Sequence, residues 1–462
     1  MRLFPPEMDI GPDEGFAPEK DIFGRKKMGE HLTNLVKNLE GPTVMLLDAP
    51  WGAGKTTFVK MWRGHLKQAG IPSIYFDAFA NDYQEDAFLA LAAEVIAAAE
   101  DLKLPEEKSL EAFKDKAVDA AKAVLKIGLR LGLRTVTAGV LSGNEIEEGN
   151  RAFSDALVTS TGDDAANSLD TILRKRLESP TADRLAFASF GKALSDIAST
   201  MARNEEDAKK KPLVFIIDEL DRCRPTFSLA VIERIKHFFS VDGVVFVIVT
   251  NVNQLEKSVT HTYGDVDAKT YLQKFFHIKA SLDAGDNLTQ HGASIKYLNH
   301  LFRYVIPKDN GNRFSEDIKE MISMVAVARD LSLRAIERVC ANVAIAIAST
   351  RNLSEAYSPI IGVLCVIKEV DGTLFAKAMA GKVSFDEICD AMMFEKWTRY
   401  NGKKENTDII QNWWRYVTEE ESLDQEWRAR IGSILFHYSD DPRSLVKYSA
   451  KLVNVASFVH PD

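Results

Sequence analysis

The sequence lacks the features of a secreted, membrane-spanning or disulfide-stabilised protein. Its 462 residues include only four cysteines, and no two of them form a CxxC pair, which excludes a zinc ribbon and a disulfide scaffold. The first residues contain no apolar stretch of the kind found in signal peptides. No run of about 18 residues is both apolar and free of charge, so a conventional transmembrane helix is not expected. These absences favour a cytoplasmic protein.

An excess of positive charge is lacking as well. Lys and Arg total 58 and Asp and Glu total 67, which leaves a formal net charge of −9. A balance of this sign argues against extended contact with a nucleic-acid backbone, so no stable DNA binding is expected. The sequence also has no recognisable Ser/His/Asp or Cys/His arrangement, no HExxH and no deaminase motif, so it indicates no second catalytic domain.

What the sequence does contain is a series of short apolar runs separated by helical segments. The runs predicted to be strands are Thr43–Leu47, Ser73–Phe76, Leu213–Ile217, Val244–Thr250 and a weaker fifth, Phe275–Ser281. Near the N-terminus a strand, a glycine-rich turn, a helix and a second strand follow one another, which is typical of a βαβ unit. The pattern therefore predicts an α/β domain with a parallel sheet.

Composition divides the chain into four segments. Residues 1–85 and 212–285 are predicted to hold the N-terminal and C-terminal parts of the α/β domain. Between them, residues 86–211 are rich in alanine and charge and are predicted to form a mainly helical insertion. Residues 286–462 show helical periodicity, so we expect an all-helical C-terminal domain.

The most informative motif follows the first predicted strand and resembles the P-loop template G-x-x-x-x-G-K-[ST]. Its glycines allow backbone N–H groups to approach phosphate, and a helix that begins at the lysine directs its own free N–H groups at the same anion. The lysine is expected to reach the β- and γ-phosphates, and Thr56 is expected to ligate Mg²⁺. The residues predicted to hold the nucleotide are Ala49, Pro50, Trp51, Gly52, Ala53, Gly54, Lys55, Thr56 and Thr57, with alanine in the first glycine position. The alternative is a glycine-rich turn before a surface helix.

A second motif follows the third predicted strand, which ends in Asp218-Glu219. Asp218 is predicted to hold Mg²⁺ through water, and Glu219 to polarise the water that attacks the γ-phosphate. The alternative is a strand that ends in an acidic surface turn. Asn251, at the end of the fourth strand, is predicted to contact the γ-phosphate or that water, unless it is only a strand-exit residue. The neighbouring Arg222 and Arg224 are expected to form surface ion pairs or to serve a neighbouring subunit.

Taken together, the motifs resemble those of the KAP family of P-loop NTPases over about residues 20–340. The motifs that carry the resemblance are Asp21–Arg25, Trp51–Thr56, Phe76–Phe79, Ile217–Cys223 and Tyr271–Phe276. The resemblance implies an additional-strand (ASCE/AAA-like) P-loop fold, in which one strand lies between the Walker A and Walker B strands, and it implies ATP and Mg²⁺. The family is mostly prokaryotic and includes phage-exclusion proteins. The sequence departs from the family pattern at Ala49, at Glu219, where Asp is frequent, and at Phe79, where Trp is common.

The resemblance also implies two sites farther from the phosphate loop. Phe23 is expected to stack on the adenine. The resemblance also implies that the helical domain of residues 286–462 is a lid. Arg334, in the first turn of a helix that Ser332 is predicted to cap, resembles a second-sensor arginine that contacts the γ-phosphate from that lid. Arg338 lies one turn further along the same face. The alternative is that these arginines pair with Glu337 or Asp330.

Two regions leave their roles open. In relatives the insertion carries membrane spans, whereas here residues 117–141 carry a basic stripe of Lys122, Lys126, Arg130 and Arg134. Such a helix could pack on its own domain, form a homo-oligomer or partner interface, or lie on an anionic membrane. In the C-terminal region, the aromatic group of Trp397, Tyr400, Trp413, Trp414, Tyr416 and Trp427 could pack between helices or stack on single-stranded nucleic acid.

The sequence thus predicts an ATP-binding, Mg²⁺-dependent ATP hydrolase that acts as a nucleotide switch or assembly engine, by resemblance in prokaryotic defence against phages or plasmids. The residues predicted to carry the reaction are Lys55, Glu219, Asn251 and Arg334. Partner proteins or further copies of the chain could bind through the insertion or the C-terminal helices. The alternatives are a nucleic-acid-stimulated motor and a scaffold that binds ATP with little turnover.

Overall fold

The chain is described by a computed structural model. The residues that it describes are 3–6, 8–84, 86–101, 107–130, 184–201, 211–282, 290–305, 314–349, 357–401, 404–435 and 442–455.

Five strands form one parallel sheet. They are β1 (Thr43–Asp48), β2 (Ser73–Asp77), β3 (Leu213–Asp218), β4 (Val244–Thr250) and β5 (Ile278–Ser281), in the order β2-β3-β4-β1-β5. Strand β4 separates the P-loop strand β1 from the acidic strand β3, which confirms the additional-strand arrangement. The fifth strand is shorter than predicted. Phe275 instead donates its N–H to the carbonyl of Leu272, in the turn that ends α9 (Ala268–Gln273).

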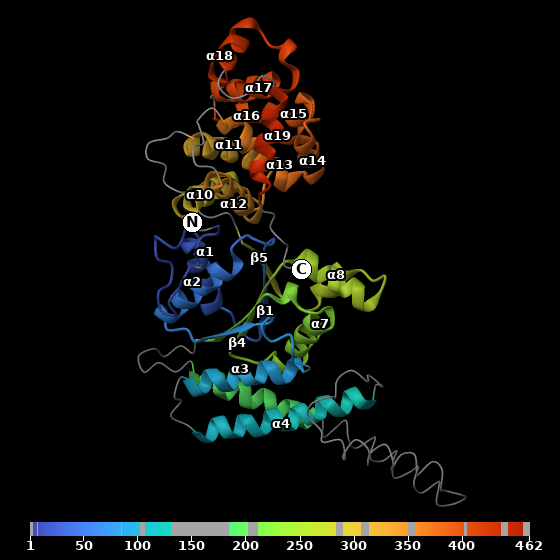
Figure 1. Cartoon of the computed structure of the whole chain (residues 1–462). Helices are drawn as coiled ribbons and strands as arrows, with labels where there is room; N and C mark the ends of the chain where they lie inside the picture. The colour runs from blue at the N-terminus through green and yellow to red at the C-terminus, as the bar shows by residue number, and fades with distance from the viewer. Residues whose placement is uncertain are drawn as a thin grey trace, which may run out of the picture.

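Helices cover both faces of the sheet (Figure 1). Successive strand residues point to opposite faces, so Met45 and Val247 pack with one set of helices while Leu46 and Phe246 pack with the other. The first set is α1 (Lys26–Lys37) and α2 (Lys55–Gln68), and the second includes α3 (Ala87–Asp101), α7 (Pro225–Arg234) and α8 (Val252–Tyr263). Because the strands are buried on both sides, they read as continuous apolar runs.

The described part of the insertion packs on its own domain. It consists of α4 (Glu107–Arg130) and a helix over 184–201. Phe190 of the second helix lies 4.9 Å from Phe88 of α3 and 5.3 Å from Phe113 of α4, measured between ring centroids. On α4, Ala117 and Ala121 are buried and Lys122 is exposed. The side chains of Lys126 and Arg130, and Arg134 as a whole, lie outside the described residues.

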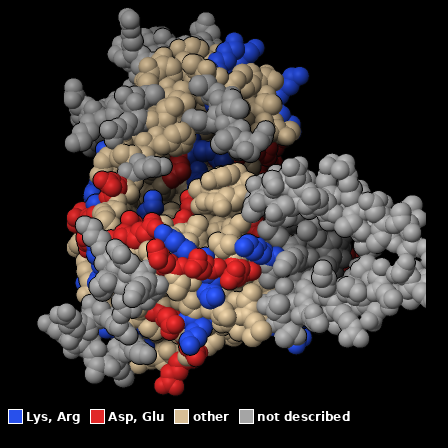
Figure 2. Space-filling view, turned by 90° about the horizontal axis from the view of Figure 1, so that it is seen from below, with Lys and Arg blue, Asp and Glu red and all other residues tan. Residues whose placement is uncertain are grey.

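The outer face of this region carries charges of both signs. Lys114 of α4 pairs with Glu100 of α3 at 2.6 Å, and Lys116 pairs with Asp119 at 3.8 Å. Figure 2, which views the molecule from below, shows acidic and basic side chains interspersed on this side. Across the described ranges, no helix combines the length and the apolar character that crossing a membrane requires.

After β5 the described chain is helical, as predicted. The helices are α10 (Gln290–Tyr304), α11 (Phe314–Ala328), α12 (Leu333–Ala348), α13 (Ser358–Val370), α14 (Gly372–Ala380), α15 (Phe385–Met392), α16 (Phe394–Asn401), α17 (Lys404–Glu419), α18 (Gln425–Leu435) and α19 (Pro442–Val453). They share one core, and α10 and α12 are the two that lie next to the α/β region (Figure 1).

The C-terminal aromatic residues belong to that helical core. Trp397, Trp413 and Trp414 are at most 5% exposed. Trp414 donates its indole N–H to the carbonyl of Pro359 at 3.1 Å. These rings are therefore not available to stack on nucleic-acid bases, and the packing interpretation holds for them. The side chain of Tyr400 lies outside the described residues.

Candidate nucleotide-binding site

The phosphate loop connects β1 to α2 and has the backbone that the motif predicts. Gly52 and Gly54 have φ values of 79° and 76°, in the left-handed region that favours glycine. Gly54 is also the N-cap of α2, which begins at Lys55 as predicted. Ala49 is absent from the positive-φ residues of the described chain. The alanine in the first glycine position is therefore compatible with the loop.

Lys55 is the central cation of the loop. Its Nζ donates to the carbonyl oxygen of Ala49 at 2.9 Å and lies 3.8 Å from Oδ2 of Asp221. Burial lowers the pKa of Lys55, and the carboxylates of Asp221, Asp218 and Glu219 oppose that effect. The lysine thus remains a suitable partner for an anion, held at the start of α2 where the helix dipole favours negative charge.

Asp218, the last residue of β3, and Glu219, which follows it, lie beside Thr56. Asp218 is fully buried and accepts a hydrogen bond from the hydroxyl of Tyr75 at 3.2 Å. Oε1 of Glu219 accepts from Oγ1 of Thr56 at 3.2 Å, and its Oε2 lies 2.7 Å from Nε of Arg222. Burial raises the pKa of both carboxyls. The structure therefore brings the acidic end of β3 next to the phosphate loop, as the sequence predicts.

The backbone of Glu219 is unusual. Its φ is 61°, a conformation that costs a non-glycine residue roughly 1–2 kcal/mol. It starts the short 3₁₀ turn η1 (Leu220–Arg222) directly after the strand. This turn brings the side chains of Asp221 and Arg222 to the same cavity as the phosphate loop. Strained backbone of this kind concentrates at functional sites.

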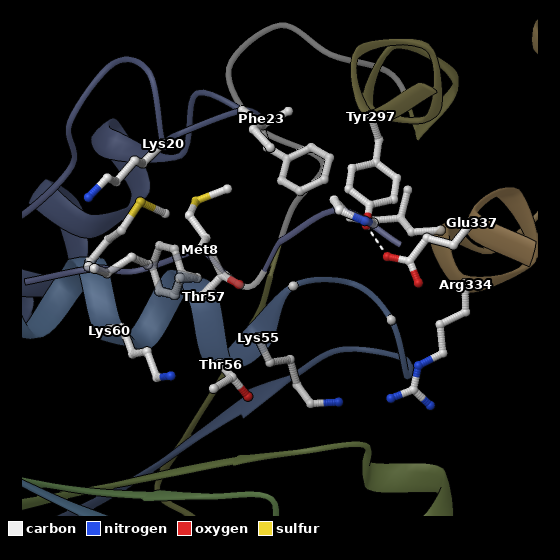
Figure 3. A pocket seen from close by; sticks show the side chains of 18 of the residues that line it. Met8, Lys20, Phe23, Lys55, Thr56, Thr57, Lys60, Tyr297, Arg334 and Glu337 are labelled. Atoms are coloured by element: carbon white, nitrogen blue, oxygen red, sulfur yellow. Dashed lines mark hydrogen bonds between the residues drawn. The ribbon is translucent and has the colours of Figure 1, made fainter. Parts of the chain in front are cut away.

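The helical region contributes Arg334 to the other side of the cavity. A Cβ added to Gly52 would lie 3.2 Å from Cγ of Arg334, so α12 approaches the phosphate loop closely. Ser332 caps α12 as predicted, accepting from the N–H of Ala335 at 3.2 Å. Figure 3 shows Lys55 and Arg334 extending into the cavity from α2 and α12.

Arg338 is directed elsewhere. Its Nε donates to Oε1 of Glu369 on α13 at 2.6 Å, and it is not among the residues that line the cavity. Its partner is thus neither Glu337 nor Asp330, which the sequence had suggested as alternatives. Of the two arginines, only Arg334 faces the phosphate loop.

The opposite end of the cavity is lined by aromatic side chains. The rings of Phe23 and Tyr297 lie 6.0 Å apart between centroids, and the hydroxyl of Tyr297 donates to Glu337 (Figure 3). Arg25 lies over the Phe23 ring at 4.6 Å and donates to the carbonyl of Ala53 at 2.7 Å. A flat ring bound here would have aromatic neighbours on two elements, which suits a nucleotide base.

The cavity as a whole has a volume of about 560 Å³, within the range of small-ligand sites. The N-terminal arm adds Phe4 and Met8 to its wall, and α10 adds Tyr297 and His300. None of these four residues is adjacent to a recognisable motif in the sequence. Sequence reasoning missed them because only the packing of the arm and of α10 brings them to the cavity.

Asn251 and Arg224 have other contacts. Asn251 is the N-cap of α8, where its side chain accepts from the N–H of Asn253 at 3.1 Å, and it is not among the lining residues. Thr250 beside it is buried, and its hydroxyl has no hydrogen-bond partner within the described residues. Arg224 pairs with Asp82 at 3.1 Å, whereas Arg222 lines the cavity.

The donor set suits a magnesium ion carried by a nucleotide. Within the described ranges, no group of three or more His, Cys, Asp or Glu side chains could hold a metal ion unaided. Thr56 and Asp218 nevertheless lie beside the phosphate loop. This fits Mg²⁺, which proteins usually hold through one or two side chains together with substrate phosphates and water. Thr56 and Asp218 are the residues that would hold it.

The chain matches a known protein family. The family model for the "KAP family P-loop domain" matches residues 25–349. Among solved structures, the chain matches the Aeropyrum pernix ORC2 protein in its ADPNP–ADP complexes, with 9% identity over 97% of this chain and 96% of that chain and a TM-score of 0.35. No curated protein matches the chain.

The matched residues of the family model include every strand of the sheet, the phosphate loop, the acidic pair and α12. The resemblance noted in the motifs therefore extends over the α/β region from residue 25 onward and into the helical region. The chain belongs to the KAP family of P-loop NTPases and is a nucleotide-binding protein.

Proposed function

We propose that this protein hydrolyses ATP with the help of Mg²⁺ and that its helical region responds to the nucleotide. The observation that supports this best is the convergence of Lys55, Glu219 and Arg334 on one cavity from three separate segments. Each supplies a different function. Lys55 neutralises the β- and γ-phosphates, Glu219 orients and polarises water, and Arg334 contacts the γ-phosphate from the lid.

In the proposed reaction, the protein acts mainly by position and charge. Bound Mg²⁺ would neutralise charge on the phosphate oxygens. The phosphate loop orients the triphosphate with its backbone N–H groups. Glu219 accepts the proton of the attacking water. Burial raises the pKa of Glu219, which brings this pKa closer to the value that suits a base acting at neutral pH.

The direct test is Glu219→Gln. The amide preserves the shape of the side chain but cannot accept a proton, so we expect the turnover rate to fall by about 10²–10⁴-fold while ATP affinity is retained. Steady-state phosphate release and calorimetric ATP binding measure the two effects. A matched control is Glu233→Gln, because Glu233 contacts Tyr263 at 2.6 Å and does not line the cavity. Wild-type turnover in Glu219→Gln would show that another group is the base.

A second candidate is an ATP-binding scaffold with little turnover. It is favoured by the Glu219–Arg222 ion pair of 2.7 Å, because a carboxylate held by arginine is less available to water. The same phosphate-release assay separates the candidates. The wild-type protein is a scaffold if it binds ATP and forms no phosphate over a period many times longer than the dissociation time of ATP.

The biological role is proposed from the family alone. From the resemblance we propose that the protein acts in the prokaryotic cytoplasm, as a switch or assembly engine in defence against phages or plasmids. The insertion or the C-terminal helices are the proposed contacts with partner proteins or further copies of the chain, and residues 117–141 are a proposed peripheral membrane contact. The identity of the neighbouring genes, and protection against phage infection that is lost with Lys55→Ala, would test the role.

A further inference from the structure

The carboxylate of Asp221 faces the phosphate loop and is almost completely removed from solvent. Its side chain is 2% exposed, and Oδ2 lies 3.8 Å from Nζ of Lys55. The same oxygen accepts the indole N–H of Trp51, at the tip of the loop. Asp221 therefore connects the turn η1 to two residues of the phosphate loop. One is the buried cation Lys55, and the other is Trp51, which is 42% exposed.

Asp221 is an unexpected residue in a site for a polyanion. Asp218 and Glu219 both have contacts that suit roles in magnesium binding and catalysis, through Tyr75 and Thr56. Asp221 instead contacts Lys55 and Trp51. Asp221 lines the cavity, where its negative charge repels phosphate unless its function is directed at the lysine.

A buried ammonium requires a counter-ion, because an uncompensated charge in a site of low dielectric constant is costly. The Lys55 side chain is only 10% exposed, and the carboxylate of Asp221 is positioned to be its counter-ion. Nucleotide phosphates are also anions that would approach Lys55. Phosphate and Asp221 must therefore compete for the same cation.

We propose that Asp221 is a positioning residue that acts as the internal counter-ion of Lys55 and competes with nucleotide phosphate for it. The carboxylate holds the lysine and Trp51 in place when phosphate is not bound. It also lowers nucleotide affinity and so favours product release. The proposal rests on the nucleotide-binding part of the proposed function and not on hydrolysis.

The test is the affinity of Asp221→Asn for ADP, measured by calorimetry with Mg²⁺ and again in its absence. The asparagine removes the charge and retains an oxygen acceptor for Trp51. We expect ADP to bind about tenfold more tightly under both conditions, since the pair is buried and its electrostatic interaction is only partly screened. We also expect a lower unfolding temperature without nucleotide and its recovery with saturating ADP, because binding stabilises the folded state.

Three variants separate charge from structure. Trp51→Phe removes the donor and retains the carboxylate, so its ADP affinity should not increase. Asp82→Asn removes a carboxylate that pairs with Arg224 at 3.1 Å outside the cavity, so its affinity should remain that of the wild type. Asp221→Ser is a second charge-free variant and should reproduce the tighter binding if the asparagine variant folds poorly.

The outcomes are distinguishable. Equal or weaker ADP binding in both Asp221 variants would overturn the proposal and would assign the residue a structural role. Weakening that occurs only with Mg²⁺ would overturn it in favour of a metal ligand. A Trp51→Phe variant that tightens binding as much as Asp221→Asn would show that the tether, not the charge, limits affinity. Because ADP is not hydrolysed, none of these results depends on whether the protein is an ATPase.

Discussion

The two ends of the nucleotide cavity are built in different ways. At the phosphate end, one continuous segment from Ala49 to Thr57 supplies the loop, the helix N-terminus and the cation. At the other end, Phe23 comes from the segment before α1, Tyr297 from α10 and Glu337 from α12, and α12 also directs Arg334 toward the phosphate loop. The phosphate end depends on local backbone geometry, and the lid end depends on the packing of distant elements. This difference suggests that the phosphate end decides whether a nucleotide binds and that the lid end decides which nucleotide binds.

The strongest test of the comparison is Lys55→Ala. The substitution removes the cation that reaches the phosphates, so we expect ATP and ADP affinities to fall together by about 100-fold or more, equivalent to about 3 kcal/mol. Calorimetry on the folded variant measures this. The control is Lys67→Ala on the same helix, since Lys67 pairs with Asp13 at the surface. Near-normal affinity in a folded Lys55→Ala variant would contradict the phosphate-site assignment.

A smaller effect of a different kind is expected for Arg334→Ala. A charge-assisted contact with the γ-phosphate contributes about 1.5–3 kcal/mol, and only ATP offers that phosphate. The ratio of ATP to ADP affinity should therefore decrease by about 10- to 100-fold, while ADP affinity is nearly unchanged.

The matched control for that prediction is Arg338→Ala. Arg338 pairs with Glu369, so the substitution should lower thermal stability and leave the ATP preference intact. If Arg338→Ala removes the preference and Arg334→Ala does not, the lid contact has been assigned to the wrong arginine. If neither variant changes the preference for ATP over ADP, the lid does not contact the γ-phosphate.

The smallest effect is expected for the residue that lies near the proposed site of the nucleotide base. Phe23→Leu removes a ring near Tyr297, and aromatic pairs contribute about 0.5–1.5 kcal/mol beyond the area they bury. ATP and ADP should bind a few-fold more weakly, whereas inorganic triphosphate, which has no base, should bind as it does to the wild type. Phe79→Leu is the control, because Phe79 is 52% exposed and does not line the cavity. Equal weakening of triphosphate binding would place Phe23 at the phosphates instead.

The sequence by itself determined the phosphate end. Glycines that must adopt positive φ, a lysine at the start of a helix and an acidic pair after a buried strand are local features, and local geometry follows from neighbouring residues. The beginning of α2 at Lys55 and the capping of α12 by Ser332 were predicted for the same reason. The position of β4 between β1 and β3 was available only through the family resemblance, since apolar runs carry no information on strand order.

Only the tertiary structure decided which side chains meet across the cavity. Arg334 and Arg338 lie one helical turn apart and look equivalent in sequence, yet one faces the phosphate loop and the other pairs with Glu369 on α13. Trp51 and Asp221 meet although 170 positions separate them. Such contacts depend on how separate helices and turns pack against one another. Sequence periodicity shows which face of a helix is buried, but it does not show which distant element that face will contact.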